Sequence, residues 1–385
     1  MTRQGGEIPA TIQSETQDAV RTSPVLRRGF IGGMAAGIGL LAGVAARPSA
    51  SYAGSRGAAA LPRDLLDSSI CRVAAVTETP APLAGPPRHL RFAYNGTGIC
   101  TAAVPVALHR GYFAKQNLEV EFVQLAGSTD QMLQALATDK ADVGASMLLN
   151  WLKPLEQGFD VKLTTGLHGG CTRLLVRRDS GFTGITDLKG KTIGVSSLAG
   201  SPRHFFAILL SRHGIDPDTG VNWREFPADL LPVALQRGEV QALADSDPAV
   251  WLTRLRSNGE LVELASNLSE NYATLSCCTL GVRAALYRDE RATTAALTRA
   301  MQAAAHHVAT QPDDAAEIFS KYTPKVPVTE LAAMLRSHTH DHAPAGAVLR
   351  REVVQITSDL KRARIIKPST DPVKLADRVV VDVLS

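Results

Sequence analysis

The stretch LEVEFVQLAGSTDQMLQALATDKADVGAS, residues 118–146, holds the pattern that decides the fold. Apolar and acidic residues alternate from Leu118 to Leu125, which is the period of a β-strand. Ser128 then stands where a helix N-cap is expected, ahead of a helically spaced segment that runs to Thr138. Ala141–Ala145 is a short apolar run of the kind that forms a buried strand. The stretch therefore predicts one β-α-β unit of a parallel sheet.

The same alternation continues on both sides of this stretch. Upstream, the sequence predicts a strand at Leu90–Tyr94 and a helix at Ala102–Ala114. Downstream, it predicts strands at Val161–Gly166, Thr192–Val195, Val221–Phe226, Val240–Ala244, Leu261–Leu264 and Thr274–Val282, and helices from Ser146 to near Gly158 and at Gly200–His213, Ala228–Arg237 and Pro248–Asn258. Four helices then follow, at Asp289–Thr310, Pro312–Tyr322, Val328–His338 and Leu349–Ala363. This order predicts two doubly wound parallel α/β sheets and a helical tail that returns to the first lobe.

Length and charge limit the classes of protein that fit. The chain has 385 residues, which is more than one typical domain, and its 45% hydrophobic content is ordinary for a globular core. The net charge is +4, and without the first 53 residues the chain keeps 36 basic and 34 acidic residues. This near balance gives no reason to expect binding to nucleic acid or to an anionic membrane surface.

Residues 1–53 are predicted to be an export signal of the twin-arginine type. Arg27 and Arg28 precede a weakly hydrophobic run, Ile31–Ala46, that is too short to span a bilayer comfortably. A small-residue cleavage site follows at residues 51–53, with residues 48–50 as a competitor. Leu26 and Gly32 depart from the twin-arginine pattern, so a general secretory signal is the alternative. The prediction is a periplasmic protein.

Residues 54–88 are predicted to be a disordered linker. They are rich in Ala, Pro, Gly and Ser, and such a composition cannot bury enough apolar surface to become ordered.

The candidate ligand site lies where predicted strands end and helices begin, because open α/β sheets bind ligands at the carboxyl ends of their strands. The residues at these ends are Asn95, Gly98, Cys100, Thr101, Ser128, Ser146, Met147, Ser201 and Asp247. Several helix N-termini that face one cleft would offer N–H donors to an anion without many Lys or Arg. The alternative is that each serine only caps its own helix, with Ser201 followed by Pro202 at a helix start.

Histidines and cysteines add further candidates. His168 and His204 fall at predicted cleft edges, where a protonated ring could pair with an anion or serve only a structural hydrogen bond. Cys171, Cys277 and Cys278 are open to three interpretations: buried apolar residues, a disulfide that joins Cys171 to Cys277 or Cys278, or a soft-metal or thiol site. Adjacent cysteines on a strand point to opposite faces, so at most one of Cys277 and Cys278 should line the cleft. His338, at the end of a helix, is predicted to lie in a solvated loop.

Several motifs together resemble the nitrate/sulfonate/taurine type of periplasmic binding protein, a group that includes thiamine-precursor proteins. The resemblance covers about residues 89–375. It rests on the ordered set Arg110-Gly111-Tyr112-Phe113, Asp142-Val143-Gly144, Asp187-Leu188-Lys189-Gly190-Lys191, Gly200-Ser201, Arg237-Gly238-Glu239-Val240 and Asp247-Pro248. It implies that Asn95, Ser128, Ser146, Ser201 and Asp247 hold the ligand.

The resemblance also implies a two-lobe clamp, the type II periplasmic binding protein fold. Lobe I is expected to comprise residues 89–172 and 283–385, and lobe II residues 173–282. The hinge crossings are expected near Thr172–Val176 and Thr279–Val282. Such a protein would work as a monomer, capture a small, anionic ligand of the sulfonate, nitrate or taurine kind, and deliver it to an ABC permease in the inner membrane.

Enzymatic motifs are missing from the sequence. It has no GxSxG, Walker, HExxH or GxGxxG motif in the required context, so no catalytic residue, metal ligand or cofactor is predicted. One alternative stays open. Some proteins of this fold modify their own ligand, as in thiamine-precursor synthesis, and His168, Cys171, Cys277 and Cys278 could serve such chemistry or bind a soft metal.

Overall fold

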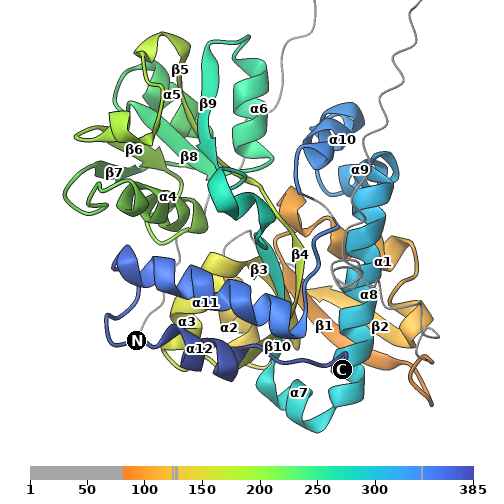
Figure 1. Cartoon of the computed structure of the whole chain (residues 1–385). Coiled ribbons are helices and arrows are strands. Elements are labelled where there is room, and N and C mark those ends of the chain that lie inside the picture. Colours follow the sequence, from red (N-terminus) through yellow and green to blue (C-terminus); the bar gives the residue numbers. More distant parts are fainter. Residues whose placement is uncertain (1–80, 124, 126–128, 340) are drawn as a thin grey trace, which may run out of the picture. The chain divides into compact units, whose positions relative to one another are not determined.

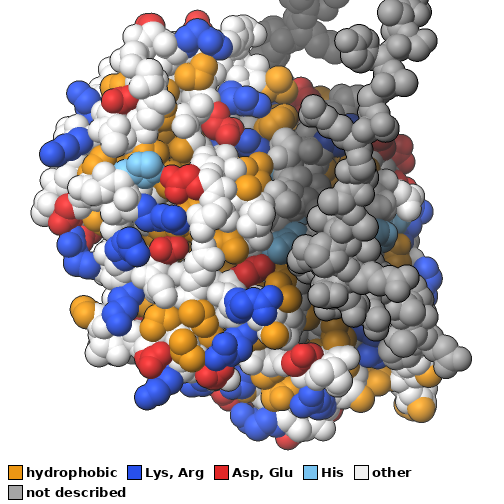
Figure 2. Space-filling model, in the orientation of Figure 1, with side chains coloured by type: hydrophobic (Ala, Val, Ile, Leu, Met, Phe, Trp, Pro, Cys, Tyr) orange, Lys and Arg blue, Asp and Glu red, His pale blue; other side chains and the backbone are white. Residues whose placement is uncertain are grey.

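Two five-stranded sheets, each flanked by helices, form the part of the chain that the structure describes (Figure 1). A computed structural model describes residues 81–123, 125, 129–339 and 341–385. The predicted export signal and residues 54–80 of the predicted linker lie outside the described residues. Among the described residues, no helix has the length and apolar character needed to cross a membrane. Figure 2 shows acidic and basic side chains interspersed over one face, in keeping with the near balance of charge.

The first sheet has the strand order β2-β1-β3-β10-β4. Its strands are β1 (Arg88–Tyr94), β2 (Leu118–Val123), β3 (Val143–Met147), β4 (Val161–His168) and β10 (Cys278–Arg283). The helices that accompany it are α1 (Ala103–His109), α2 (Thr129–Ala137), α3 (Leu148–Glu156), α7 (Ala284–Asp289), α8 (Arg291–Thr310), α9 (Pro312–Ser320) and α10 (Val328–Arg336). The quoted stretch does form a β-α-β unit, although its second strand runs two residues past Ala145 and includes Ser146.

The second sheet has the order β7-β6-β8-β5-β9. Its strands are β5 (Thr172–Arg177), β6 (Thr192–Val195), β7 (Asn222–Glu225), β8 (Ala242–Ser246) and β9 (Leu261–Ser266), and its helices are α4 (Ser201–Arg212), α5 (Leu231–Gln236) and α6 (Ala249–Arg256). The two-sheet α/β prediction is confirmed. The sequence analysis had treated the β5 segment only as a hinge crossing.

Both sheets are mixed rather than purely parallel, which corrects the prediction of parallel sheets. In the first sheet β10 runs antiparallel to β3 and β4, and in the second β5 runs antiparallel to β8 and β9. Both are the first strands that the chain forms after it crosses between sheets. A chain that leaves one sheet at its carboxyl edge enters the next at the facing edge, so the new strand must run in the opposite direction to the parallel strands.

The two crossings lie just before the segments predicted for them. The chain passes from β4 to β5 through residues 169–171, and from β9 to β10 through residues 267–277. Thr172–Val176 is therefore part of β5, and Thr279–Val282 is part of β10. Because β10 pairs with β3 and β4, residues 278–283 belong to the first sheet, whereas the sequence had assigned residues 278–282 to lobe II.

Two C-terminal helices follow, α11 (Gly346–Arg362) and α12 (Pro372–Val379), and α12 packs against α11 and β4. The α11 helix packs against β4 and against α4, and it lies across the base of the second lobe in Figure 1. From the second crossing, the Tyr272 hydroxyl donates to Asp359 of α11 at 2.8 Å. The returning tail is thus attached to the hinge as well as to the first lobe. The helix α11 was predicted from the sequence, and α12 was not.

Candidate functional site

A cavity of about 1080 Å³ lies between the two sheets. Its wall includes residues from the first turns of α2, α3, α4 and α6, together with the loop between β1 and α1. The helix N-termini therefore converge on one space, as the sequence predicted. The cavity is at the upper end of the size range of ligand pockets, so a small ligand would be bound there together with ordered water.

Most of the candidate site residues line this cavity. These are Asn95, Gly98, Cys100, Thr101, Ser146, Met147, Ser201, His204 and Asp247. Ser128 lies outside the described residues. His168, Cys171 and Cys278 are not among the lining residues, and they instead form a cluster with Cys100.

Several lining residues escaped the sequence analysis. They are Thr97, Met132, Asn150, Lys153, Ser196, Ser197, Arg203, Trp223, Asp245 and Ser246. Two signals could have found some of them: Asn150 follows Ser146 at one helical turn, and Ser196-Ser197 and Asp245-Ser246 stand at the carboxyl ends of two predicted strands.

A chain of hydrogen bonds crosses the cavity from one lobe to the other. The Ser201 hydroxyl, at the start of α4, donates to Asn150 Oδ1 of α3 at 2.6 Å. The Asn150 amide donates to the hydroxyl of Ser146 at 3.2 Å. Ser201 was considered as a helix cap, but Gly200 occupies the N-cap position and Ser201 is the first residue of α4. Ser201 instead links the two lobes.

Asp247 lines the cavity, but its carboxylate is held by two other side chains. The side chain is fully buried, and it pairs with Arg173 of β5 at 3.1 Å and with His338 Nε2 at 2.8 Å. Arg173 also pairs with Glu263 at 2.6 Å and donates to Ser337 at 2.9 Å. Because Ser337 and His338 follow α10 of the first lobe, this buried network joins the lobes. The prediction that His338 lies in a solvated loop is wrong.

Two further ionisable groups on the cavity wall are buried. Burial, with help from the positive charges of Arg203 and Lys153, lowers the pKa of His204 to about 4, so the ring is neutral at physiological pH. His204 cannot then supply the positive charge that the sequence analysis considered. Burial raises the pKa of Asp245, whose carboxylate accepts hydrogen bonds from the Ser196 hydroxyl and the Ser246 amide.

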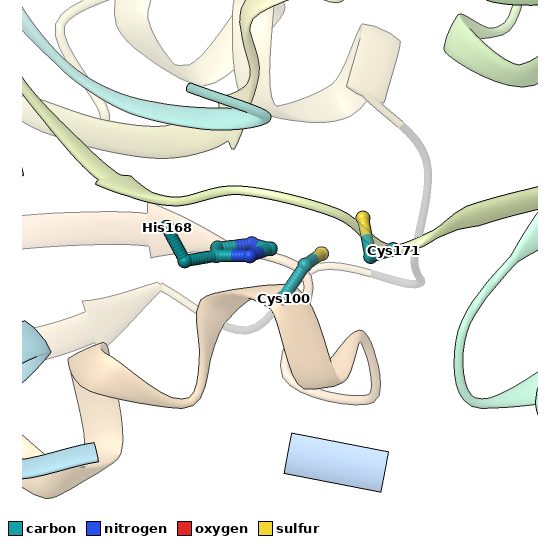
Figure 3. A group of neighbouring side chains, drawn as sticks. All are labelled: Cys100, His168 and Cys171. Atoms are coloured by element: carbon teal, nitrogen blue, oxygen red, sulfur yellow. The ribbon is translucent and has the colours of Figure 1, made fainter. Parts of the chain in front are cut away.

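Four cysteines and one histidine lie together beside the cavity. Cys100 comes from the loop after β1, His168 from the end of β4 and Cys171 from the first crossing, while Cys277 ends the second crossing and Cys278 begins β10. The donor atoms of Cys100, His168 and Cys171 lie within 4.8 Å of one another, as do those of His168, Cys277 and Cys278. Figure 3 shows the first of these triplets.

Neither Cys277 nor Cys278 lines the cavity, in keeping with the expectation that at most one of them would, but their sulfur atoms do not point to opposite faces. Cys277 precedes β10, so it does not follow the alternation of the strand, and both sulfurs reach the cluster. The Cys171 and Cys277 sulfurs are 3.1 Å apart as free thiols. Contacts with Cys171 and Cys278 lower the pKa of Cys100.

His168 is the charged partner of these thiols. Burial alone would lower its pKa, but the hydrogen bond with Cys100 and the negative charges of the cysteines raise the pKa of His168 to about 9. The ring also bonds to the carbonyl of Gly169 at 2.8 Å, and it stacks on His338 with the ring centres 5.6 Å apart. His168 therefore serves the sulfur cluster, behind the cavity wall.

The fold and site together define a two-lobe binding-protein architecture with its cavity at the interface of the lobes. Residues 101–315 match the family described as NMT1/THI5 like, and the chain belongs to this family. A Haemophilus influenzae protein whose name refers to thiamine biosynthesis is 25% identical over 241 residues, which cover 60% of this chain and 73% of that protein.

Two solved structures share the fold. The periplasmic aliphatic sulphonate binding protein of Escherichia coli has a TM-score of 0.62 and 17% identity, over 77% of this chain and 93% of that one. The periplasmic nitrate-binding protein of Synechocystis has a TM-score of 0.60 and 14% identity, over 76% and 85%. These likenesses confirm the two-lobe periplasmic binding protein fold.

Replacing Arg173 with Met is expected to destabilise the protein by about 3–5 kcal/mol, because it leaves the buried carboxylate of Asp247 without its strongest partner. Urea unfolding measures the change. Arg177→Met is the matched control on the same strand, since Arg177 pairs with Asp179 at the exposed surface and its loss should have no measurable effect. Equal effects of the two changes would contradict the structural role of the buried pair.

His204→Asn is expected to flatten the dependence of stability on pH. Above pH 6.5 the ring is neutral in both the folded and the unfolded chain, so it has no effect there. As the pH falls towards 4, only the unfolded chain binds the proton, and the wild type should lose up to about 3 kcal/mol more than the variant. Urea unfolding from about pH 7 to about pH 4 tests this. Parallel curves for the two proteins would show that His204 titrates normally.

Proposed function

We propose that this chain is an exported solute-binding protein that captures a small ligand between its lobes and delivers it to the permease of an ABC importer. One observation carries the proposal: a single cavity is walled by helix starts from both sheets and is crossed by the bond between Ser201 and Asn150. Closing the lobes would bury a ligand there, and opening them would release it. The sulfonate- and nitrate-binding proteins that share the fold support this function.

The chemistry of the wall favours a ligand that carries both an acceptor and a donor group. The helix starts offer N–H donors and partial positive charge, which suit a sulfonate, carboxylate or nitrate oxygen. The charged side chains that are buried in the wall, however, are the acids Asp245 and Asp247, while Lys153 and Arg364 are exposed. Arg203 is half-buried and pairs with Asp218. A simple anion would use only the helix starts.

An aminosulfonate or another zwitterion uses both sets of groups. Its anionic end would bind at the starts of α3 and α4, and its ammonium or N–H end would donate to Asp245. Such a ligand keeps the predicted anionic group and adds a positive group that the acidic part of the wall can accept. A polar heterocycle with N–H donors is the second class that fits Asp245.

The proposed location is the periplasm. It depends on the predicted export signal in residues 1–53, and the sulfonate- and nitrate-binding proteins of the same fold are described as periplasmic. A monomer is proposed, since each chain contains both halves of the clamp.

A thermal-shift screen tests the proposed function. The purified chain is mixed with nitrate, alkanesulfonates, aminosulfonates, small carboxylates, amino acids and heterocyclic amines. A true ligand at about 100 times its Kd should stabilise the protein by about 2.7 kcal/mol. The ligand should be recovered unchanged after long incubation, whereas a ligand-modifying enzyme would convert it. Stabilisation by none of these classes would contradict the proposal.

For the ligand found in the screen, Ser201→Ala and Asn95→Ala are each expected to weaken binding by about 1–3 kcal/mol. Ser201 bridges the lobes, and Asn95 Oδ1 holds the β1–α1 loop by accepting from the Thr97 amide at 3.1 Å. Isothermal titration calorimetry measures the affinities. Ser358→Ala is the control, because Ser358 is exposed on α11 and bonds to the Val354 carbonyl in its own helix.

Asp245→Asn is expected to weaken the binding of a ligand with an ammonium group more than the binding of a plain anion. The opposite order of the two effects would contradict the proposal of a zwitterionic ligand.

A further inference from the structure

The cluster of Cys100, His168, Cys171, Cys277 and Cys278 lies outside the proposed transport chemistry, apart from Cys100, which also lines the cavity. Two triplets of donor atoms share His168, and within each triplet every separation is below 4.8 Å. The Cys171 thiol is also within hydrogen-bonding reach of Cys100, Cys277 and Cys278. Five donor groups from four separate parts of the chain therefore converge on one small volume.

We propose that this cluster binds one thiophilic d¹⁰ cation, Zn²⁺ or Cu⁺, through His168 and up to three of the four cysteines. Thiolate sulfur and imidazole nitrogen are the ligands that both ions prefer, and neither triplet contains a carboxylate that would suit Mg²⁺ or Ca²⁺. Zinc–sulfur bonds of about 2.3 Å in a tetrahedron place the sulfurs roughly 3.8 Å apart. Small side-chain rotations bring the observed separations to this value.

Burial and access also suit a metal. Cys171 and Cys278 are fully buried and His168 is nearly so, which protects a bound ion from water. Cys100 is partly exposed and lines the cavity, and Cys277 is partly exposed and lines a second, small pocket of about 30 Å³. An ion could enter from the cavity past Cys100. The Gly169 carbonyl at 2.8 Å from His168 Nδ1 can fix the ring so that Nε2 serves as the ligand.

The competing outcome is a disulfide between Cys171 and Cys277. Such a bond would use only two of the four thiols and would leave Cys100 and Cys278 beside His168. Simple apolar packing does not account for the cluster either, because it gives no reason for the donor atoms of an imidazole and of several thiols to lie within 4.8 Å of one another. A metal ion uses the imidazole and the thiolates together.

A bound ion would also brace the hinge. Its ligands would come from both crossings and from the loop after β1, so the ion would cross-link the segments about which the lobes must move. We therefore expect the metal-loaded protein to unfold at a higher temperature than the metal-free protein, whether or not the transport ligand is present.

The test uses the full chain, reduced and freed of metal, then titrated with Zn²⁺ or, under anaerobic conditions, with Cu⁺. After gel filtration, elemental analysis should find one ion per chain. Co²⁺ in place of zinc should give the thiolate charge-transfer band and the visible bands of tetrahedral cobalt. Cys171→Ser and Cys278→Ser each remove a metal ligand. Loss of a group that only hydrogen-bonds to a ligand weakens metal binding by about 10–100-fold, so each of these changes should weaken it by at least that much. His306→Asn, a change of an exposed histidine on α8, is the control and should keep full metal binding.

A second measurement does not depend on whether the variants fold. In the wild type, bound metal should protect Cys100, Cys171, Cys277 and Cys278 from alkylation, as read by peptide mass spectrometry. A reduced protein that retains neither ion, or equal alkylation of these four cysteines with and without metal, would overturn the proposal. So would a Cys171–Cys277 disulfide that re-forms in the presence of metal. None of these outcomes depends on the identity of the transported ligand.

Discussion

The direction in which the chain crosses between its two sheets is the constraint on which the rest of the structure depends. Each crossing begins at the end of a strand, and the next strand runs antiparallel to its new neighbours, as β5 and β10 do. This arrangement turns the carboxyl edges of both sheets towards one gap. The helices that follow the parallel strands then start at that gap, so the cavity, its N–H donors and the hinge all result from the same topology.

Local pattern was sufficient to predict the fold. The period of two in β2, the apolar run of β1 and the helical spacing of α4 are properties of neighbouring residues, and the structure contains all three elements. The prediction of strand direction was wrong. When both faces of a sheet are buried, parallel and antiparallel strands can have the same residue pattern, so the sequence does not distinguish them. The β5 strand and the α12 helix were missed although both have local signals: β5 contains the apolar run Leu174–Val176, and Asp371 followed by Pro372 marks the start of α12.

The site was predicted where it depends on chain order and missed where it depends on distance in space. Asn95, Ser146 and Ser201 follow directly from their places near strand ends and helix starts. The pairing of Asp247 with His338 joins residues 91 positions apart, and no sequence pattern reports it. The neutral state of His204 likewise results from its burial. That burial depends on the packing of the folded chain and cannot be read from the residues next to His204 in the sequence.

The buried polar groups of the hinge form one continuous column between the lobes. The sulfur cluster contacts His168, which stacks on His338; His338 bonds to Asp247, and Asp247 pairs with Arg173 of the second sheet. Each contact is buried, so breaking one would leave a polar or charged group without a partner, at a cost of several kcal/mol for a charge. The contacts of the column are therefore expected to stay intact when the lobes open and close, so that the lobes rotate about the column. Cys100 and Asp247 both belong to the column and line the cavity, so the column forms part of the cavity wall.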